Sequence, residues 1–293
     1  MKISVLTATY NREKLLLKLF ESLKKNYETY QDFEWIIMDD GSSDNTEKEV
    51  KKWIKEVNFK IDYHYQENKG KQREINDAIQ FVTGDVVIEV DSDDYLLDDA
   101  LKTIATDFAS LDNDNVYGII YKRKLGSKNT DTKEELNNKV LTLFDIHNKY
   151  DYDFDMALVF KTEVRKKYYY EVCKNENFVT EARLYYKLDQ IYDGMVFKDK
   201  YLVYGEYIEE GYSKNINKIF KKYPHGYYEY FNECLTYIKK DTLFKRKLYF
   251  IKHYILFSYI IGLSKIECIK KAQKYNFIIA LLVIPGYIKA KRF

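Results

Sequence analysis

The chain is poor in cysteine and glycine, and each shortage excludes a class of protein. Its three cysteines, Cys173, Cys234 and Cys268, lie far apart without paired spacing. Neither a disulfide framework nor a zinc site is therefore predicted, and a reducing compartment fits. Neither G-x-G-x-x-G nor G-x-x-x-x-G-K-[ST] occurs in the sequence. Any bound phosphate must then be met by side chains or a metal instead of a glycine-rich cradle.

Long apolar runs are also missing. No uninterrupted run approaches the roughly 18–20 apolar residues that a transmembrane helix requires. The apolar start is too short for a signal peptide because Asn11-Arg12-Glu13 follows it closely. With 46% hydrophobic and 17% aromatic residues in 293, the chain can still bury the core of one large or two small domains.

Charge is nearly balanced over the whole chain but unevenly distributed. Residues 1–212 hold 31 basic and 42 acidic side chains, whereas residues 213–293 hold 17 and 4, a net charge of +13. This asymmetry predicts an acidic catalytic part and a basic tail that can meet an anionic surface. The tail has two apolar runs, 254–263 and 277–288, of the length of buried or interfacial helices. Pro285-Gly286 is expected to break the second.

Strand and helix patterns alternate through about the first 115 residues. The first four candidate strands are residues 3–7, 33–38, 60–65 and 86–90. Each is followed by a polar loop and a segment with apolar residues at helical spacing, which predicts an α/β fold with a mostly parallel sheet. Parallel strands gather their carboxyl ends at one edge, where ligands bind. Tyr10, Asp39, Gly70-Lys71 and Asp91–Asp94 should therefore converge on a nucleotide site.

The fourth strand ends in an acidic run, Asp91-Ser92-Asp93-Asp94. On an extended strand, Asp91 and Asp93 would point the same way and Asp94 the other. Neighbouring carboxylates repel each other unless a cation lies between them, and a hard divalent cation is the natural candidate. An EF-hand is disfavoured because the sixth loop position is not glycine. The alternative is a solvated turn or a helix cap.

Four ordered blocks resemble family 2 inverting glycosyltransferases of the GT-A fold, in a bacterial polysaccharide-type form. They are ISVLTATYNRE, IIMDDGSSDNT, QENKGKQREINDAI and GDVVIEVDSDDYL, all within residues 1–100. The resemblance implies a Rossmann-like, nucleotide-diphospho-sugar transferase domain at residues 1–212. Its nucleotide-binding half would be residues 1–95 and its acceptor and sugar half residues 96–212. Residues 213–293 would be a basic, amphipathic helical extension.

The same resemblance implies roles for individual residues in binding a UDP-sugar. Asp39 would accept the uracil N3–H, and Tyr10 and the Ala8 backbone would line the base. Asp91 and Ser92 would meet the ribose or phosphate. Asp93 would ligate Mn²⁺ or Mg²⁺ as part of a DXD-type motif, with Asp91 as a further metal contact.

One block departs from the commoner family pattern. Many members have Ala-Arg-Asn-x-Gly in this helix, whereas this chain has Glu74-Ile75-Asn76-Asp77-Ala78. The chain resembles a subgroup with Asn-x-Gly-Lys followed by Asn, so Lys71 and Asn76 are assigned to donor binding. Lys71 would neutralise phosphate in place of the missing arginine. The alternative is a solvated lysine on a loop.

Inversion by direct displacement needs a base that deprotonates the acceptor hydroxyl. Asn177-Phe178-Val179-Thr180-Glu181 resembles the Phe-x-x-Glu form of some polysaccharide transferases, which makes Glu181 the candidate base. Asp189 and Glu176 are the next candidates. Glu181 can equally serve only as a favourable partner of a helix dipole.

The implied reaction is transfer of one sugar to an acceptor hydroxyl in cell-surface polysaccharide or glycolipid assembly. The Gln-x-x-Arg-Trp segment of processive synthases is missing, and residues 205–213 resemble a closing loop. A lipid-linked glycan or polysaccharide acceptor and a peripheral position at the cytoplasmic membrane face follow, without a nucleic-acid partner. Dimer or lid packing are other uses for the tail, so the oligomeric state stays open. The competing functions are a nucleotidyltransferase and a non-catalytic sugar-nucleotide-binding protein.

Overall fold

The computed structural model describes residues 1–126, 134–152, 155–205 and 216–290. The chain divides into two compact units that interleave along the sequence. The first comprises residues 1–141, 154–170 and 192–211, and the second residues 142–153, 171–191 and 212–293. The predicted boundary at residue 212 stays a prediction about functional domains. The closing loop predicted for residues 205–213 lies, apart from Gly205, outside the described residues.

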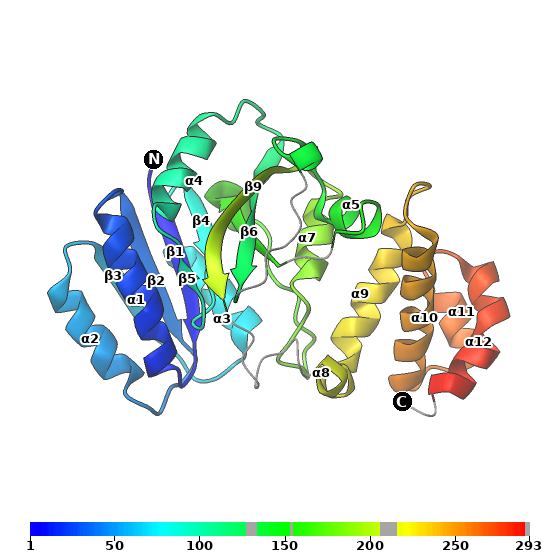
Figure 1. Ribbon diagram of the computed structural model, residues 1–293. Helices are drawn as coiled ribbons and strands as arrows, with labels where there is room; N and C mark the ends of the chain where they lie inside the picture. The colour runs from blue at the N-terminus through cyan, green and yellow to red at the C-terminus, as the bar shows by residue number, and fades with distance from the viewer. Residues whose placement is uncertain (127–133, 153–154, 206–215, 291–293) are drawn as a thin grey trace. The chain divides into compact units, whose positions relative to one another are not determined.

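The first unit is an α/β fold that begins with alternating strands and helices (Figure 1). Its strands are β1 Ile3–Thr9, β2 Phe33–Asp39, β3 Lys60–Tyr65, β4 Val86–Glu89, β5 Tyr95–Leu96, β6 Val116–Leu125, β7 Val140–Leu141, β8 Met156–Lys161 and β9 Gly194–Gly205. Its helices are α1 Glu13–Tyr27, α2 Thr46–Glu56, α3 Lys71–Ala78, α4 Ala100–Ala109 and α6 Thr162–Arg165, with 3-10 turns η1 Ile79–Phe81 and η2 Glu134–Leu136.

Within the described residues these strands form one nine-stranded sheet in the order β3-β2-β1-β4-β8-β6-β9-β5, with β7 paired to β9. The pairs among β1, β2, β3 and β4 are parallel. Strand β8 lies antiparallel between β4 and β6. The predicted α/β fold with a mostly parallel sheet at its start is therefore confirmed.

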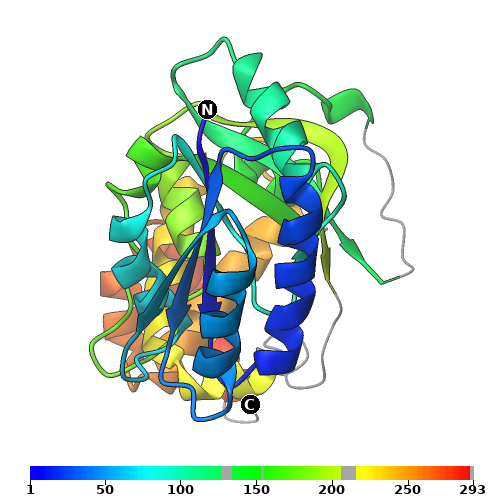
Figure 2. The same ribbon diagram turned by 90° about the vertical axis from the view of Figure 1, so that its left-hand side faces the viewer.

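The core of the first unit follows the period of two that a strand imposes. Odd-numbered residues of β1 and β2, such as Val5 and Trp35, pack in one apolar cluster with α1, α2 and α4. Figure 2 shows α1 and α2 in front of the first three strands. Phe20 of α1 stacks on Trp53 of α2 with ring centroids 4.5 Å apart. Even-numbered residues of both strands are also largely buried, as expected for a sheet covered on both faces.

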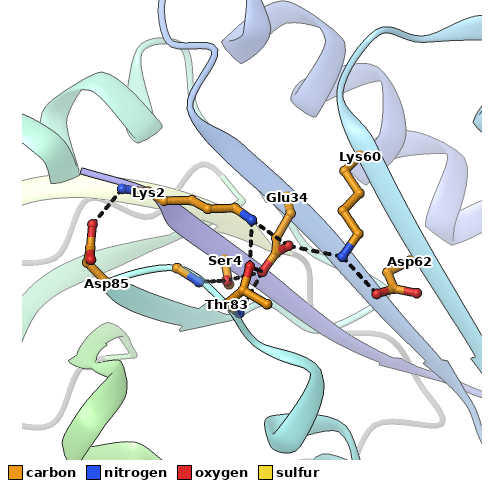
Figure 3. A network of polar contacts seen from close by, with 8 residues as sticks. Lys2, Ser4, Glu34, Lys60, Asp62, Thr83 and Asp85 are labelled. Atoms are coloured by element: carbon orange, nitrogen blue, oxygen red, sulfur yellow. Dashed lines mark hydrogen bonds and ion pairs between the residues drawn. The ribbon is translucent and has the colours of Figure 1, made fainter.

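The amino edge of this sheet is held by a buried carboxylate, Glu34 on β2 (Figure 3). Its Oε1 accepts hydrogen bonds from Ser4 Oγ at 2.7 Å and from both the amide and the hydroxyl of Thr83. Its Oε2 accepts from Lys2 Nζ at 2.8 Å and from Lys60 Nζ at 3.3 Å. One carboxylate thus links β1, β2, β3 and the turn before β4.

The second unit is helical and aromatic-rich. Its helices are α5 Leu143–Asn148, α7 Ala182–Leu188, α8 Ile216–Lys222, α9 Pro224–Tyr237, α10 Phe244–Ile260, α11 Lys265–Lys271 and α12 Asn276–Ala290. Phe231 of α9 stacks on Phe257 of α10 at 5.5 Å between centroids. The predicted helical character of the segment after residue 215 is confirmed where the structure describes it.

The predicted break at Pro285-Gly286 is wrong, because α12 continues from Asn276 to Ala290 with Pro285 inside it. Packing outweighs the hydrogen bond that proline forfeits. A Cβ atom on Gly286 would lie 2.6 Å from Ile255 Cγ2, so glycine allows α12 to approach α10 closely. Over the described residues, every helix is too short or too polar to cross a membrane.

Candidate functional site

Asp39 is the last residue of β2 and is fully buried. Its Oδ1 accepts the Ser42 amide at 2.7 Å, and its Oδ2 accepts the Tyr63 hydroxyl at 2.7 Å. Burial and the Asp39 carboxylate raise the pKa of Tyr63, so the phenol stays a donor. Each carboxylate oxygen of Asp39 keeps a further lone pair. Asp39 is thus held in a fixed orientation and can accept one more hydrogen bond.

The adjacent Asp40 has a structural role in the loop that leads into α3. Its carboxylate accepts hydrogen bonds from Gln66 Nε2, from the Lys69 amide and from the Gly70 amide, at 3.0, 2.8 and 2.7 Å. Gly70 has φ +90°, a conformation that side chains other than glycine rarely adopt. Asp40 therefore shapes the loop that leads into α3, and Asp39 is the better placed of the two for a ligand.

Tyr10 follows β1 and is 49% exposed, and Ala8 within β1 is partly exposed. The loop carrying Tyr10 is tied to the loop after β2 through Asn11. The Asn11 amide donates to Ser42 Oγ at 2.8 Å, and Asn11 Oδ1 accepts the Ser43 amide at 2.7 Å. These bonds hold the loop of Tyr10 beside the loop that follows Asp39, at the carboxyl edge, as the sequence predicts.

The acidic run after β4 forms a turn. Strand β4 ends at Glu89, and the Asp94 amide donates to the Asp91 carbonyl at 2.9 Å. The predicted strand-like alternation of Asp91, Asp93 and Asp94 is therefore wrong, because the chain leaves the extended conformation first. Ser92 within this turn is buried.

Each carboxylate of the turn has its own cation. Lys71 Nζ lies 2.6 Å from Asp91 Oδ1, Arg12 Nη1 lies 2.8 Å from Asp93 Oδ1, and Arg123 Nη2 lies 2.5 Å from Asp94 Oδ1. The prediction that a cation must offset these charges is met here by three basic side chains. They come from three places in the sequence: the loop after β1, the first turn of α3, and β6.

The pKa values of Asp91 and Asp94 in this turn are shifted in opposite directions. Desolvation opposes the charged form of Asp91, but the Lys71 ammonium outweighs it and keeps the pKa of Asp91 below its usual range. Burial and the nearby Asp91 charge raise the pKa of Asp94 to about 7, against the opposing effect of Arg123. A Cβ on Gly205 would lie 2.3 Å from both Arg123 Nη2 and Asp94 Oδ1. Glycine at 205 therefore makes room for this ion pair.

The helix after β3 contains one predicted residue engaged elsewhere and one that sequence reasoning missed. Asn76 Nδ2 donates to the Tyr170 carbonyl at 2.9 Å, and Asn76 Oδ1 accepts the Tyr170 amide at 2.8 Å. Its amide therefore holds the segment at Tyr170. Glu74 is buried, and its Oε1 accepts the Thr9 amide at 3.1 Å. Burial, with the Asp40 charge, raises the pKa of Glu74 to about 10, so this acid is neutral near pH 7.

Glu181, the candidate base, belongs to the second unit. It is the residue before α7, and its Oε2 accepts the Tyr185 hydroxyl at 3.4 Å. The rival acids are engaged with main-chain amides of their own unit. Asp189 accepts the Phe144 amide at 2.8 Å. Glu176 accepts the first amides of α9, from His225 and Gly226, at 2.7 and 2.8 Å, so both rivals serve as structural acceptors.

A divalent metal fits the donor chemistry of the turn. In the described part of the chain, no three His, Cys, Asp or Glu side chains gather into a cluster that could hold a metal by itself. Asp91 and Asp93 nevertheless offer hard oxygen ligands, and Mg²⁺-type sites commonly combine one or two carboxylates with substrate phosphates and water. Arg12 and Lys71 already share these carboxylates, so a metal and these cations would compete.

The fold and the acidic carboxyl edge define the class as GT-A. The crystal structure of Staphylococcus aureus TarS residues 1–349 with UDP-GlcNAc matches at a TM-score of 0.67 and 18% identity, covering 100% of this chain and 90% of that chain. Mannosyltransferase PcManGT from Pyrobaculum calidifontis, solved with GDP-Man and Mn²⁺, matches at 0.57 and 15% identity, over 99% and 80% of the two chains. At these identities the likeness shows the fold alone.

Sequence comparison narrows the class to a family. The model of glycosyl transferase family 2 matches residues 4–167, more than half of the chain. The chain therefore belongs to glycosyl transferase family 2. Poly(ribitol-phosphate) beta-N-acetylglucosaminyltransferase TarS of Staphylococcus aureus is 36% identical over 105 residues. The matched segment is 36% of this chain and only 18% of that protein.

Proposed function

We propose that the chain is a metal-dependent, inverting glycosyltransferase that moves one sugar from a UDP-sugar to an acceptor hydroxyl. The observation that carries this proposal is the meeting, at one sheet edge, of the buried Asp39 and the ion-paired turn Asp91–Asp94. A UDP donor is supported by the relative TarS, whose structure was solved with UDP-GlcNAc. The identity of the transferred sugar is left to experiment.

The proposed donor site uses the carboxyl edge of the first unit. Asp39 accepts the uracil N3–H with one of its remaining lone pairs, and the exposed Tyr10 ring covers the base beside the Ala8 backbone. Asp91 and Ser92 meet the ribose. Lys71, which is paired to Asp91 at 2.6 Å, is close enough to the turn to neutralise phosphate as well.

In this proposal Asp93, with Asp91, holds Mn²⁺ or Mg²⁺. When bound, the metal would offset negative charge on the departing diphosphate. The Mn²⁺ in the PcManGT structure supports a metal in a protein of this fold. Lys71, Arg12 and Arg123 supply further positive charge around the same carboxylates.

Inversion requires a base, and we assign that role to Glu181. Asp189 and Glu176 are less suitable because each already accepts main-chain amide hydrogens. Glu181→Gln keeps the size of the side chain but removes its basicity. We expect this variant to bind UDP-sugar normally and to turn over at least 100-fold more slowly, and near-normal turnover would move the role elsewhere.

The proposed acceptor is a lipid-linked glycan or polysaccharide at the cytoplasmic face of the membrane. Assembly of a cell-surface polymer or glycolipid is supported by the relative TarS, a poly(ribitol-phosphate) beta-N-acetylglucosaminyltransferase. The basic helical tail supplies positive charge for such a surface.

The deciding experiment measures release of UDP from a panel of UDP-sugars with Mn²⁺ or Mg²⁺, in wild type and Asp93→Asn. We expect UDP release by wild type and its loss in the variant. Asp98→Asn is the matched control, because Asp98 is exposed and pairs only with Lys25 among the contacts described for it. Formation of UTP and sugar 1-phosphate from a UDP-sugar when pyrophosphate is added, without release of UDP, would identify a nucleotidyltransferase. Binding without release would identify a sugar-nucleotide-binding protein.

A further inference from the structure

Helix α12 has apolar residues on two opposite faces. One face is buried against the rest of the helical unit and includes Ile279, Val283 and Tyr287. The Tyr287 hydroxyl donates to the Leu263 carbonyl at 2.8 Å. This face accounts for how α12 is attached.

The opposite face carries an apolar stripe made of Phe277, Leu281, Ile284 and Ile288. Their positions, i, i+4, i+7 and i+11, lie on one side of a helix. The side chains are 78%, 64%, 55% and 60% exposed, respectively. A helix that is apolar all round is normally buried all round, so a partner for this stripe is expected.

The segment that contains the stripe is basic. Residues 264–290 contain five lysines and a single acid, Glu267. The Glu267 side chain is engaged in capping α11, where its Oε2 accepts the Ser264 amide at 2.8 Å. Lys265, Lys270 and Lys271 on α11 are exposed, and α11 packs beside α12.

We propose that the α12 stripe inserts into the surface of an anionic lipid bilayer, with the lysines of α11 at the headgroups. Exposed aromatic and aliphatic side chains beside lysines are the composition of helices that lie in the membrane interface. At 15 residues α12 is too short to span a bilayer. If two chains paired through the stripe, their basic segments would repel each other. Anionic lipid would instead attract the basic segment.

This inference deepens the proposed function by naming the surface that meets the membrane. It is tested apart from catalysis, by co-sedimentation of the full chain with phosphatidylcholine vesicles containing 30% phosphatidylglycerol. Phe277→Ser/Leu281→Ser is the test variant, and Leu17→Ser/Ile54→Ser is the control. Leu17 and Ile54 are exposed apolar residues of helices in the first unit, 44% and 42% exposed.

We expect the test variant to bind anionic vesicles at least tenfold more weakly than wild type, and the control to bind like wild type. Binding of wild type should also weaken on pure phosphatidylcholine and at high salt. Equal binding by the test variant, or no binding by wild type, overturns the proposal. A wild-type dimer in light scattering that dissociates in the test variant, without vesicle binding, would assign the stripe to a second copy. UDP release without vesicles should be unchanged, because α12 contains none of the proposed donor-site residues.

Discussion

Replacement of the buried Glu34 by glutamine should destabilise the first unit by an amount that depends on pH. The hydrogen bonds from Lys2, Ser4 and Thr83 favour the carboxylate over the acid. They outweigh the opposing effect of burial and lower the pKa of Glu34 from 4.5 to about 2. A glutamine amide would place an N–H₂ group where Glu34 now accepts from lysine or from Ser4 and Thr83. The ion pairs with Lys2 and Lys60 would also be lost.

The magnitude follows from linkage between protonation and folding. A shift of 2.5 units at about 1.36 kcal/mol per unit gives roughly 3.4 kcal/mol at pH 7. Since the folded-state pKa of Glu34 is depressed, this stability is fully present above pH 4.5 and is lost as pH falls through 2. At pH 3 the same relation leaves about 1.4 kcal/mol.

Tryptophan fluorescence during urea unfolding measures this effect selectively. The chain has two tryptophans, Trp35 and Trp53, and both are buried in the first unit. Glu49→Gln is the control, because Glu49 forms an exposed pair with Lys52 and should contribute under about 1 kcal/mol. A Glu34→Gln loss at pH 7 as small as that of the control, or one that does not shrink between pH 7 and pH 3, would refute the reasoning.

Three further outcomes follow from the carboxyl edge. Arg12→Gln should strengthen Mn²⁺ binding without nucleotide about fivefold by calorimetry, because the Asp93 carboxylate loses a competing cation worth roughly 1 kcal/mol; unchanged affinity would mean no competition. Gly205→Ala should lower the free energy of unfolding by about 1–3 kcal/mol, since its Cβ displaces Arg123. Glu74→Gln should stabilise the first unit by about 3 kcal/mol at pH 7 and little at pH 4, because only the unfolded chain ionises between those values. Urea unfolding checks both, and destabilisation by Glu74→Gln at pH 7 would contradict a neutral acid.

The first hundred residues could be predicted well because their signals are local. Each strand of the parallel part is an apolar run followed by a polar loop, and its neighbours come next in the sequence. The antiparallel strand β8 could not be placed in the same way. Its position between β4 and β6 depends on pairings such as Ile88 with Val159, which bring together residues far apart along the chain.

The same contrast between local signals and long-range contacts applies to the candidate site. Asp39 and Asp91–Asp94 lie at the predicted edge because each directly follows its strand. Of their basic partners, Lys71 was predicted at this edge, whereas Arg123 was missed because it reaches Asp94 only after β6 has joined the sheet. The engagement of Asn76 by Tyr170 has the same cause, since the two residues are 94 positions apart. Arg12 was also missed, although it had a local signal, since it lies within the block that contains Tyr10.

The pKa values of buried carboxyl groups are shifted in opposite directions at the two edges of the sheet. At the amino edge, two lysines and three short hydrogen bonds keep Glu34 charged, so ionisation stabilises the fold. At the carboxyl edge, Glu74 and Asp94 have raised pKa values, so ionisation costs stability. Perturbed carboxyl groups of the second kind concentrate at functional sites. The stability gained by ionisation of Glu34 at the amino edge can therefore offset the electrostatic cost of burying Glu74 and Asp94 at the carboxyl edge. This is the edge at which we propose that the nucleotide binds.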